Sequence, residues 1–294
     1  MMAEQPITTI SSALDWGRTL LRDMSDTHMM DVRLLLGAAL DVKQEYLIQV
    51  PERTLTPQQT SDFQEMVGQR AQGEPLAYLL GKQMFYDIEV CVTPDVLIPR
   101  PETELLVEKA IAFAKGKGTV IVDVGAGSGI IALALAKHLP TAQVTGIDLS
   151  SAALEVARCN SEHMGLSDRI RWLRGNLLQP LLESGETADL IVANLPYIPT
   201  DEMLKLDVSK HEPIVALDGG TDGLDVIRRF MQNAPKVLRE GGLILMEIGS
   251  GQGQAVKTIA EAAFPDAVVQ VSADLAGHER IVSVQTGQTD TSNE

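Results

Sequence analysis

The spacing of hydrophobic residues divides the chain into two parts. Residues 8–80 place apolar side chains at helical spacing without strand alternation, which predicts a small helical domain. Within it, Thr56 is predicted to cap a helix whose first turn contains Pro57. From residue 85 the pattern changes to alternation, which predicts a β-hairpin that joins this domain to the rest of the chain.

The predicted hairpin buries Ile88, Val90 and Val92 on one face, and Pro94-Asp95 is expected to supply its turn. Beyond it, short apolar runs alternate with helical segments, a pattern typical of a parallel sheet covered by helices. The predicted strands are residues 119–124, 143–148, 170–174, 189–193, 243–248, 268–272 and 280–284. The predicted helices are residues 130–138, 152–164, 224–238 and 252–263.

These elements predict four parts of the chain. They are a helical domain of residues 1–83, a hairpin connector of residues 84–98, an α/β domain of residues 99–286 and a tail of residues 287–294. The tail has no hydrophobic side chains to bury, so we expect it to be disordered.

Composition and charge argue against several classes of protein. The 294 residues carry a net charge of −16, a field that repels polyphosphate, so no direct nucleic-acid partner is expected. No apolar run approaches a transmembrane length and the first residues lack a signal-peptide pattern, which predicts a cytoplasmic protein without a membrane partner. Scattered histidines and two isolated cysteines, Cys91 and Cys159, predict no metal site and no disulfide. We interpret both cysteines as core thiols and expect a monomer.

A glycine-rich loop follows the first predicted strand of the α/β domain. Gly125, Gly127 and Gly129 lie between that strand and a helix, where glycine permits tight turns and close approach of the backbone to a ligand. Ile130 occupies the position at which the dinucleotide-binding fingerprint has its third glycine. A ligand smaller than a dinucleotide is therefore favoured.

The second predicted strand ends at Asp148, whose carboxylate can accept both hydroxyls of a ribose. In the alternative interpretation, Asp148-Leu149-Ser150 only begins the next helix, with Ser150 as its cap. A glycine loop followed by such an acid, without the dinucleotide spacing, resembles the class I S-adenosylmethionine-dependent methyltransferases over residues 120–284. This resemblance implies a Rossmann-like sheet and S-adenosylmethionine as cofactor.

The same resemblance implies a set of cofactor-binding residues. Asp123 would help to hold the amino-acid end of the cofactor, whereas Asn176 and Leu177 would contact its adenine. Asn176 stands where the family often has an aspartate, which is a departure from the pattern. The complete predicted set is Asp123, Gly125, Ala126, Gly127, Ser128, Gly129, Asp148, Leu149, Asn176, Leu177 and Asn194.

The fourth predicted strand runs into Asn194-Leu195-Pro196-Tyr197. In an open sheet of this type it lies beside the first strand, so the glycine loop, Asp148 and this segment are expected to meet in one crevice. Asparagine and proline are common in loops, and Tyr197 could simply cover the core. In the crevice, however, the segment suits an amide or exocyclic amine that accepts a methyl group.

An amide nitrogen is a weak nucleophile because its lone pair is delocalised into the carbonyl. We predict that Asn194 Oδ1 and the backbone carbonyl of Leu195 accept its two N–H groups. Pro196 would restrict the backbone of Leu195, and Tyr197 would stack on the flat target group. These four residues are the predicted catalytic residues.

Other segments favour one methyl acceptor among three. Asn-x-Pro-Tyr is shared by methyltransferases that act on adenine, guanine or protein glutamine. The segments "VLIPRPETELLVE", "HEPIVALDGGTDGLDVIRR", "LMEIGSGQGQAV" and "DLAGHERIV" resemble the bacterial release factor glutamine methyltransferases of the PrmC/HemK type. That resemblance implies a seven-stranded, mostly parallel methyltransferase sheet and a small N-terminal helical domain that docks the substrate.

The implied reaction is S-adenosylmethionine-dependent methylation of the glutamine side chain in the Gly-Gly-Gln motif of class 1 peptide chain release factors. Phe85, Pro99 and Arg100 would lie near the crevice and contact the substrate, together with the Asn194–Tyr197 segment. Pro101 would also occupy the first turn of a helix. Two alternatives remain open, a glutamine methyltransferase of a large-subunit ribosomal protein and an adenine or guanine amino-methyltransferase. Leu195 replaces a proline that is usual in the family, and we predict retained activity because only its carbonyl is required.

Overall fold

The computed structural model describes residues 7–24 and 26–287. The chain forms two compact units, Met1–Lys82 and Gln83–Glu294. In the part of the chain that is described, no helix combines the length and the apolar character needed to cross a bilayer.

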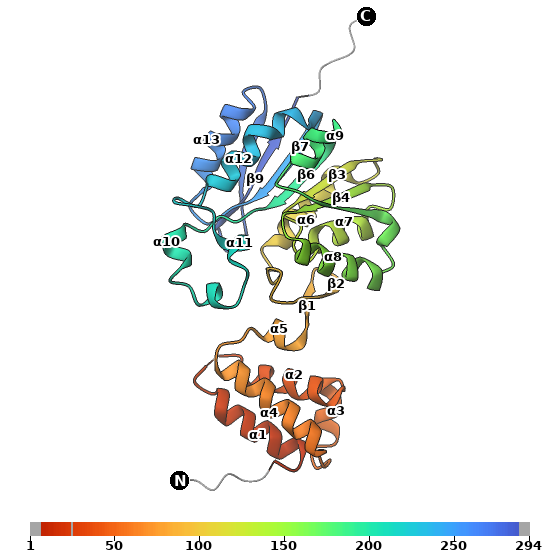
Figure 1. Cartoon of the computed structure of the whole chain (residues 1–294), viewed down its shortest axis with the longest axis vertical. Coiled ribbons are helices and arrows are strands. Elements are labelled where there is room, and N and C mark those ends of the chain that lie inside the picture. Colours follow the sequence, from red (N-terminus) through yellow and green to blue (C-terminus); the bar gives the residue numbers. More distant parts are fainter. Residues whose placement is uncertain (1–6, 25, 288–294) are drawn as a thin grey trace, which may run out of the picture. The chain divides into compact units, whose positions relative to one another are not determined.

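The first unit is a bundle of helices. Its elements are α1 (Ile10–Leu21), α2 (His28–Leu40), α3 (Gln44–Gln49), α4 (Pro57–Ala71) and α5 (Leu76–Leu80) (Figure 1). Thr56 caps α4 as predicted, because its side chain accepts the N–H of Gln59 while the Gln59 side chain accepts the N–H of Thr56. The helices bury one apolar cluster in which Leu35, Leu36 and Phe63 are fully buried.

The hairpin consists of β1 (Lys82–Phe85) and β2 (Ile88–Cys91). Ile88 and Val90 are buried, as the alternation predicts. The predicted turn at Pro94-Asp95 is wrong, since the strands reverse at Tyr86-Asp87, where Tyr86 adopts a φ of 53°. Its backbone N–H donates to Glu104 Oε1 at 2.9 Å, and this contact from a distant helix stabilises a turn that lacks glycine.

The second unit is built on a seven-stranded sheet with the order β5-β4-β3-β6-β7-β9-β8. Its strands are β3 (Val120–Val124), β4 (Gln143–Asp148), β5 (Ile170–Arg174), β6 (Ala188–Asn194), β7 (Leu238–Glu247), β8 (Val268–Ala273) and β9 (Glu279–Gln285). Only the pairings of β9 are antiparallel. The order reverses between β3 and β6, which places the switch point between the two strands that carry the glycine loop and Asn194.

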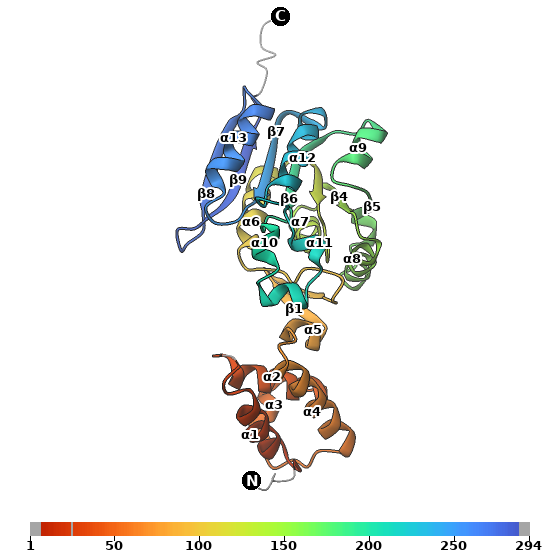
Figure 2. The same ribbon diagram turned by 60° about the vertical axis from the view of Figure 1, so that its left-hand side comes forward.

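Helices cover both faces of this sheet (Figures 1 and 2). They are α6 (Thr103–Ala114), α7 (Ile130–His138), α8 (Ser151–His163), α9 (Gln179–Ser184), α12 (Asp225–Asn233) and α13 (Gly253–Ala263). Two short helices, α10 (Thr200–Met203) and α11 (Ile214–Leu217), lie in the connection between β6 and β7, beyond the ends of the strands. On one face α6 packs on β6, β7 and α7, and on the other α12 packs on α13. The predicted α/β fold class is thereby confirmed.

Some predicted details differ from the structure. The helix predicted to continue to Leu238 ends at Asn233, because Pro235 cannot supply the N–H that an α-helix requires and the chain turns through a short 3₁₀ segment, Ala234–Lys236. The interpretation of the cysteines as core thiols is wrong, since Cys159 is exposed and Cys91 is half-buried. The tail predicted to be disordered lies outside the described residues, apart from Gly287.

Candidate active site

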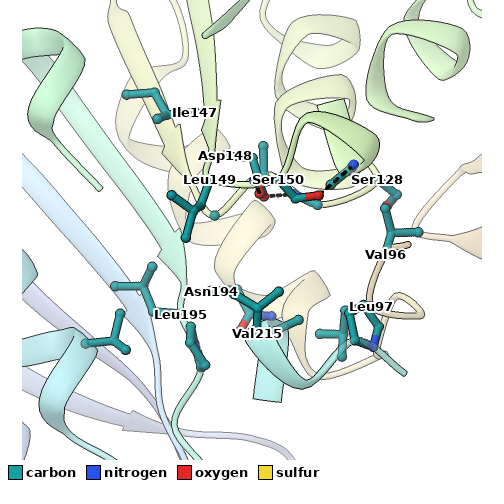
Figure 3. A pocket seen from close by; sticks show the side chains of 18 of the residues that line it. Val96, Leu97, Ser128, Ile147, Asp148, Leu149, Ser150, Asn194, Leu195 and Val215 are labelled. Carbon is teal, nitrogen blue, oxygen red and sulfur yellow. Dashed lines mark hydrogen bonds between the residues drawn. The ribbon is translucent and has the colours of Figure 1, made fainter. Parts of the chain in front are cut away.

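A cavity of about 460 Å³ lies at the carboxyl ends of β3, β4 and β6, within the second unit. Figure 3 shows Asp148, Leu149 and Asn194 around it. Most of the predicted site residues line the cavity, namely Gly125, Ala126, Gly127, Ser128, Asp148, Leu149, Asn176, Leu177, Asn194, Leu195, Pro196, Pro99 and Arg100. Four predicted residues do not line it: Asp123, Gly129, Tyr197 and Phe85.

The glycine loop leaves β3 in a tight turn. Its first N–H groups, of Gly125 and Ala126, donate to the carbonyl of Ile147 on β4 at 2.9 and 3.0 Å. Gly129 has a φ of 81°, and a Cβ atom there would lie 2.7 Å from Trp172 Cη2. Gly127 also has a positive φ, of 54°, but no atom lies within 4 Å of its Cβ position. Gly129 therefore serves close packing, whereas Gly127 faces open space.

Asp148 forms hydrogen bonds to the backbone on both sides of it. Its Oδ2 accepts the N–H of Gly127 and its Oδ1 accepts the N–H of Ser150, each at 2.8 Å. The Ser150 side chain in turn caps α8 by accepting the N–H of Ala153. Each carboxylate oxygen keeps acceptor capacity beyond its one backbone partner. Asp148 thus joins the glycine loop to α8 and still presents acceptors to the cavity that it lines.

Asp123 is fully buried at the end of β3, beneath the loop. Its Oδ2 accepts the N–H of Ala132 in α7 at 3.1 Å, and among the described residues its buried Oδ1 has no hydrogen-bond partner. Burial raises the pKa of this carboxyl group to about 7, against the lowering effect of the Ala132 N–H, and the nearby charge of Asp148 adds a smaller rise. An unpaired buried carboxylate oxygen suits a cationic ligand group.

Asn176 and Leu177 follow β5 along the cavity wall. Leu177 has a φ of 55°, which is uncommon for a leucine. The Oδ1 of Asn176 accepts a hydrogen bond from Arg229 Nη2 at 2.9 Å. Arg229 of α12 also lines the cavity and was not predicted from the sequence. Asn176, the predicted adenine contact, is therefore hydrogen-bonded to a basic residue that is distant in the sequence.

Asn194 is the last residue of β6 and lies in register with Glu247, the last residue of β7. Asn194 Nδ2 donates to Thr103 Oγ1 at 3.2 Å, and the Thr103 hydroxyl donates to Glu247 Oε2 at 2.6 Å. The hydroxyl of Tyr197 donates to Glu247 Oε1 at 3.4 Å. Burial raises the pKa of Glu247 above its usual value and also raises the pKa of the Tyr197 hydroxyl.

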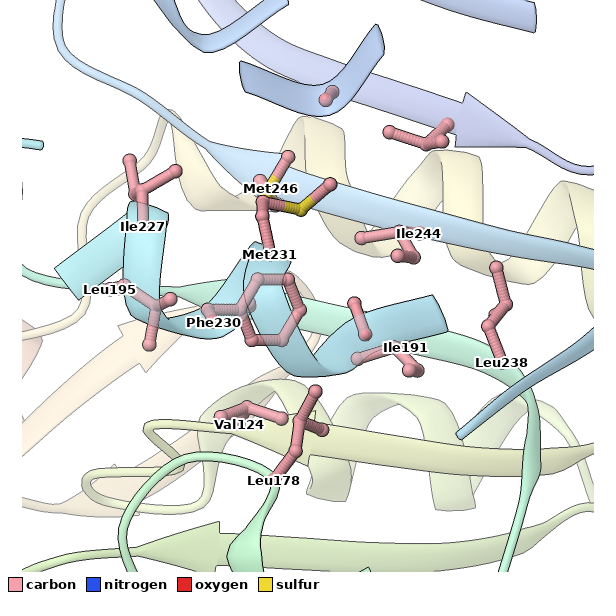
Figure 4. Close-up of a cluster of buried hydrophobic side chains, with 14 of the residues drawn as sticks. Val124, Leu178, Ile191, Leu195, Ile227, Phe230, Met231, Leu238, Ile244 and Met246 are labelled. Atoms are coloured by element: carbon pink, nitrogen blue, oxygen red, sulfur yellow. The ribbon is translucent and has the colours of Figure 1, made fainter. Parts of the chain in front are cut away.

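The side chain of Leu195 packs into the hydrophobic core beside Val124, Ile227 and Phe230 (Figure 4). It is 3% exposed. A Cβ atom at Gly125 would lie 3.2 Å from the backbone oxygen of Asn194, so the glycine loop and the end of β6 lie in close contact. In this chain the side chain at position 195 therefore anchors the segment to the core.

The segment that contains Pro99 and Arg100 is held by Glu212. This glutamate is 5% exposed, accepts the N–H of Ile98 at 3.1 Å through Oε2 and forms an ion pair with Arg100 through Oε1. The prediction that Pro101 occupies the first turn of a helix is wrong, since α6 begins at Thr103 with Glu102 at the N-cap position. The sequence analysis missed four site residues, Thr103, Glu212, Arg229 and Glu247, although all four lie inside sequence segments that resemble the family.

The residues that line the cavity fit S-adenosylmethionine. Asp148 offers acceptors to ribose hydroxyls, and the apolar Leu149 and Leu177 line the same cavity. Asp123 Oδ1 is an acceptor without a partner among the described residues, but it is buried and does not line the cavity. Among the described residues, no group of three or more histidine, cysteine, aspartate or glutamate side chains is placed to hold a metal ion.

Comparison with known proteins is consistent with this geometry. Residues 12–81 match the PrmC N-terminal domain and residues 115–291 match a methyltransferase domain. The chain is 41% identical to the release factor glutamine methyltransferase of Geobacter sulfurreducens over 259 residues, which cover 87% of this chain and 89% of that protein. It is 44% identical to that of Moorella thermoacetica, with 85% and 89% covered. The chain belongs to the release factor glutamine methyltransferase family.

The family resemblance predicted from the sequence is thus confirmed, and the chain is an enzyme of the methyltransferase class. Among solved structures, a 16S rRNA methyltransferase of T. thermophilus in complex with AdoMet and guanosine matches with a TM-score of 0.52 and 20% identity, covering 70% of this chain and 49% of that one. At this identity the match concerns the fold alone.

Proposed function

We propose that this enzyme transfers the methyl group of S-adenosylmethionine to the side-chain amide nitrogen of the glutamine in the Gly-Gly-Gln motif of class 1 peptide chain release factors. The observation that carries the proposal is the position of Asn194, whose carboxamide lines the same cavity as the glycine loop and Asp148. Family membership indicates a protein glutamine as the methyl acceptor.

We assign the glycine-loop side of the cavity to the cofactor. When bound, S-adenosylmethionine supplies an electrophilic methyl group on a positively charged sulfur. Asp123 and Asp148 would bind the amino group and the ribose hydroxyls, while Leu149 and Leu177 would pack on the adenine. Asp148, Leu149 and Leu177 already line the cavity at neighbouring strand ends. Asp123 is fully buried beside them, so the glycine loop has to shift before Asp123 can reach the ligand.

Asn194 and Leu195 act on the methyl acceptor. Asn194 Oδ1 accepts one N–H of the glutamine amide and the Leu195 carbonyl accepts the other, which holds the nitrogen towards the cofactor. Among the described residues, neither Asn194 Oδ1 nor the Leu195 carbonyl oxygen accepts a hydrogen bond from another group of the protein. Pro196 restricts the backbone at Leu195 and has no N–H of its own that could compete for the substrate. The rate acceleration comes mainly from this positioning and from preorganised acceptors.

A competition experiment tests the substrate class. The purified enzyme and radiolabelled S-adenosylmethionine are mixed in one reaction with an unmodified class 1 release factor, ribosomal proteins of the large subunit and DNA, and the labelled species are then separated. We expect label in the release factor. Label in a ribosomal protein or in DNA, with none in the release factor, would contradict the proposed substrate.

A further inference from the structure

We propose that Thr103 and Glu247 are positioning residues that determine which end of the Asn194 carboxamide faces the substrate. The inference rests on the proposed function, in which Asn194 Oδ1 accepts an N–H of the glutamine amide. The two ends of a carboxamide have nearly the same shape but opposite hydrogen-bonding roles. If the group turned over, two donors would meet the N–H groups of the substrate and binding in the reactive orientation would be lost.

The register between β6 and β7 pairs Asn194 with Glu247. Asn194 and Glu247 are paired residues at the ends of these parallel strands, so their side chains emerge on the same face of the sheet. Thr103, the first residue of α6, lies between them, with hydrogen bonds to both side chains. The three residues belong to three elements that are far apart in the sequence. Asn194 and Thr103 line the cavity, and Glu247 is buried next to Thr103.

The two hydrogen bonds of Thr103 have defined directions. Burial raises the pKa of Glu247, hydrogen bonds from Thr103 and Tyr197 and the charge of Arg280 lower it against that effect, and as a carboxylate Glu247 can only accept. Its 2.6 Å contact with Thr103 Oγ1 has the length typical of a hydroxyl that donates to a carboxylate. The single proton of the threonine hydroxyl is thereby used. The oxygen of Thr103 can then only accept from Asn194, which selects Nδ2 as the atom that faces it, at 3.2 Å. Oδ1 is left at the other end of the planar group.

The buried carboxylate of Glu247 needs hydrogen-bond donors. Glu247 is 2% exposed, and a buried charged acceptor is tolerated only where hydrogen bonds satisfy it. Thr103 supplies one donor and the hydroxyl of Tyr197 supplies another, to the second carboxylate oxygen. The Thr103 proton is directed to Glu247, so it cannot also point towards Asn194. The buried acceptor thus sets the direction of the entire chain of hydrogen bonds.

The test replaces the hydroxyl of Thr103 and measures methyl transfer in a single turnover. Thr103→Val removes the hydroxyl at nearly constant volume, Thr103→Ser retains it, and Thr103→Ala is a second variant that lacks it. Thr145→Val is the matched control, because Thr145 is a buried threonine of β4 without a hydrogen bond to Asn194. Thermal melting and S-adenosylmethionine affinity are measured for every variant.

We expect Thr103→Val and Thr103→Ala to lower the single-turnover rate constant by about tenfold or more, as misplacement of a reacting group does. Thr103→Ser and Thr145→Val should stay close to the original protein, and the affinity for S-adenosylmethionine should change little in all four. In a protein that already carries Asn194→Ala, the Thr103→Val change should have almost no further effect, since no carboxamide remains to be oriented.

Two outcomes would overturn the inference. One is an unchanged rate in both variants that lack the hydroxyl. The other is a loss of the same size with and without Asn194→Ala, which would show that Thr103 acts independently of the carboxamide. Failure of the unaltered protein to methylate the release factor would instead contradict the proposed function, so the two failures are distinguishable.

Discussion

Asp123 provides a quantitative test of how the site is built. Its carboxyl group is fully buried, one oxygen lacks a partner among the described residues, and burial raises its pKa from 3.8 to about 7. Because the pKa is higher in the folded state than in the unfolded chain, protonation of Asp123 favours folding. This contribution is complete below the unfolded pKa and is lost as the pH rises through 7.

The shift in the pKa of Asp123 determines how much its ionisation destabilises the protein. Each unit of pKa corresponds to about 1.4 kcal/mol, so ionisation of Asp123 destabilises the protein by about 4 kcal/mol at pH 8 and by about 1.7 kcal/mol at pH 5. Asp123→Asn removes the ionisable group and keeps an oxygen that can accept the N–H of Ala132. The free energy of unfolding of the variant, relative to that of the unaltered protein, should rise by about 2.5 kcal/mol from pH 5 to pH 8.

Thermal melting of the ligand-free protein at the two pH values measures this gain. About 2.5 kcal/mol corresponds to about 5–10 °C in Tm for a domain of this size. The Tm difference between Asp123→Asn and the unaltered protein should increase by that amount from pH 5 to pH 8. A difference that does not change with pH would refute the assignment of a raised pKa to Asp123.

Two further predictions concern the cofactor side of the cavity. Asp148→Asn should weaken S-adenosylmethionine binding by about tenfold or more, because it replaces a charged acceptor of ribose hydroxyls, and calorimetric titration showing unchanged affinity would exclude that role. Gly129→Ala should lower the free energy of unfolding by about 1–3 kcal/mol, since its Cβ would lie 2.7 Å from Trp172. Gly127→Ala, at a position with open space, should cost less stability in denaturant titration but weaken cofactor binding, and the reverse order of stability would contradict this distinction.

The features predicted best from the sequence are those with a local cause. The glycine loop and Asp148 each follow an apolar strand directly, and parallel strands bring their carboxyl ends to one edge of the sheet. Ser150 caps α8, as the alternative interpretation of this segment had it, and that role is likewise determined by the residues just after Ser150.

The features that were missed depend on contacts between distant segments. The hairpin turns at Tyr86 with the help of Glu104, a residue of a later helix. Thr103 and Glu247 are far apart in the sequence, and only the packing of α6 on the sheet brings them to Asn194. No local pattern distinguishes such residues from an ordinary helix start or strand end, and the buried side chain of Leu195 was likewise visible only in the packed core.

The central claim is that Asn194 supports methylation of one glutamine of a release factor. The most direct measurement digests an unmodified class 1 release factor after incubation with S-adenosylmethionine and either the unaltered enzyme or Asn194→Ala, and locates the added methyl group by tandem mass spectrometry. We expect a methyl group on the glutamine of the Gly-Gly-Gln motif with the unaltered enzyme and almost none with the variant, at similar cofactor affinity. Methylation at another residue, or equal methylation by the two proteins, would contradict the account.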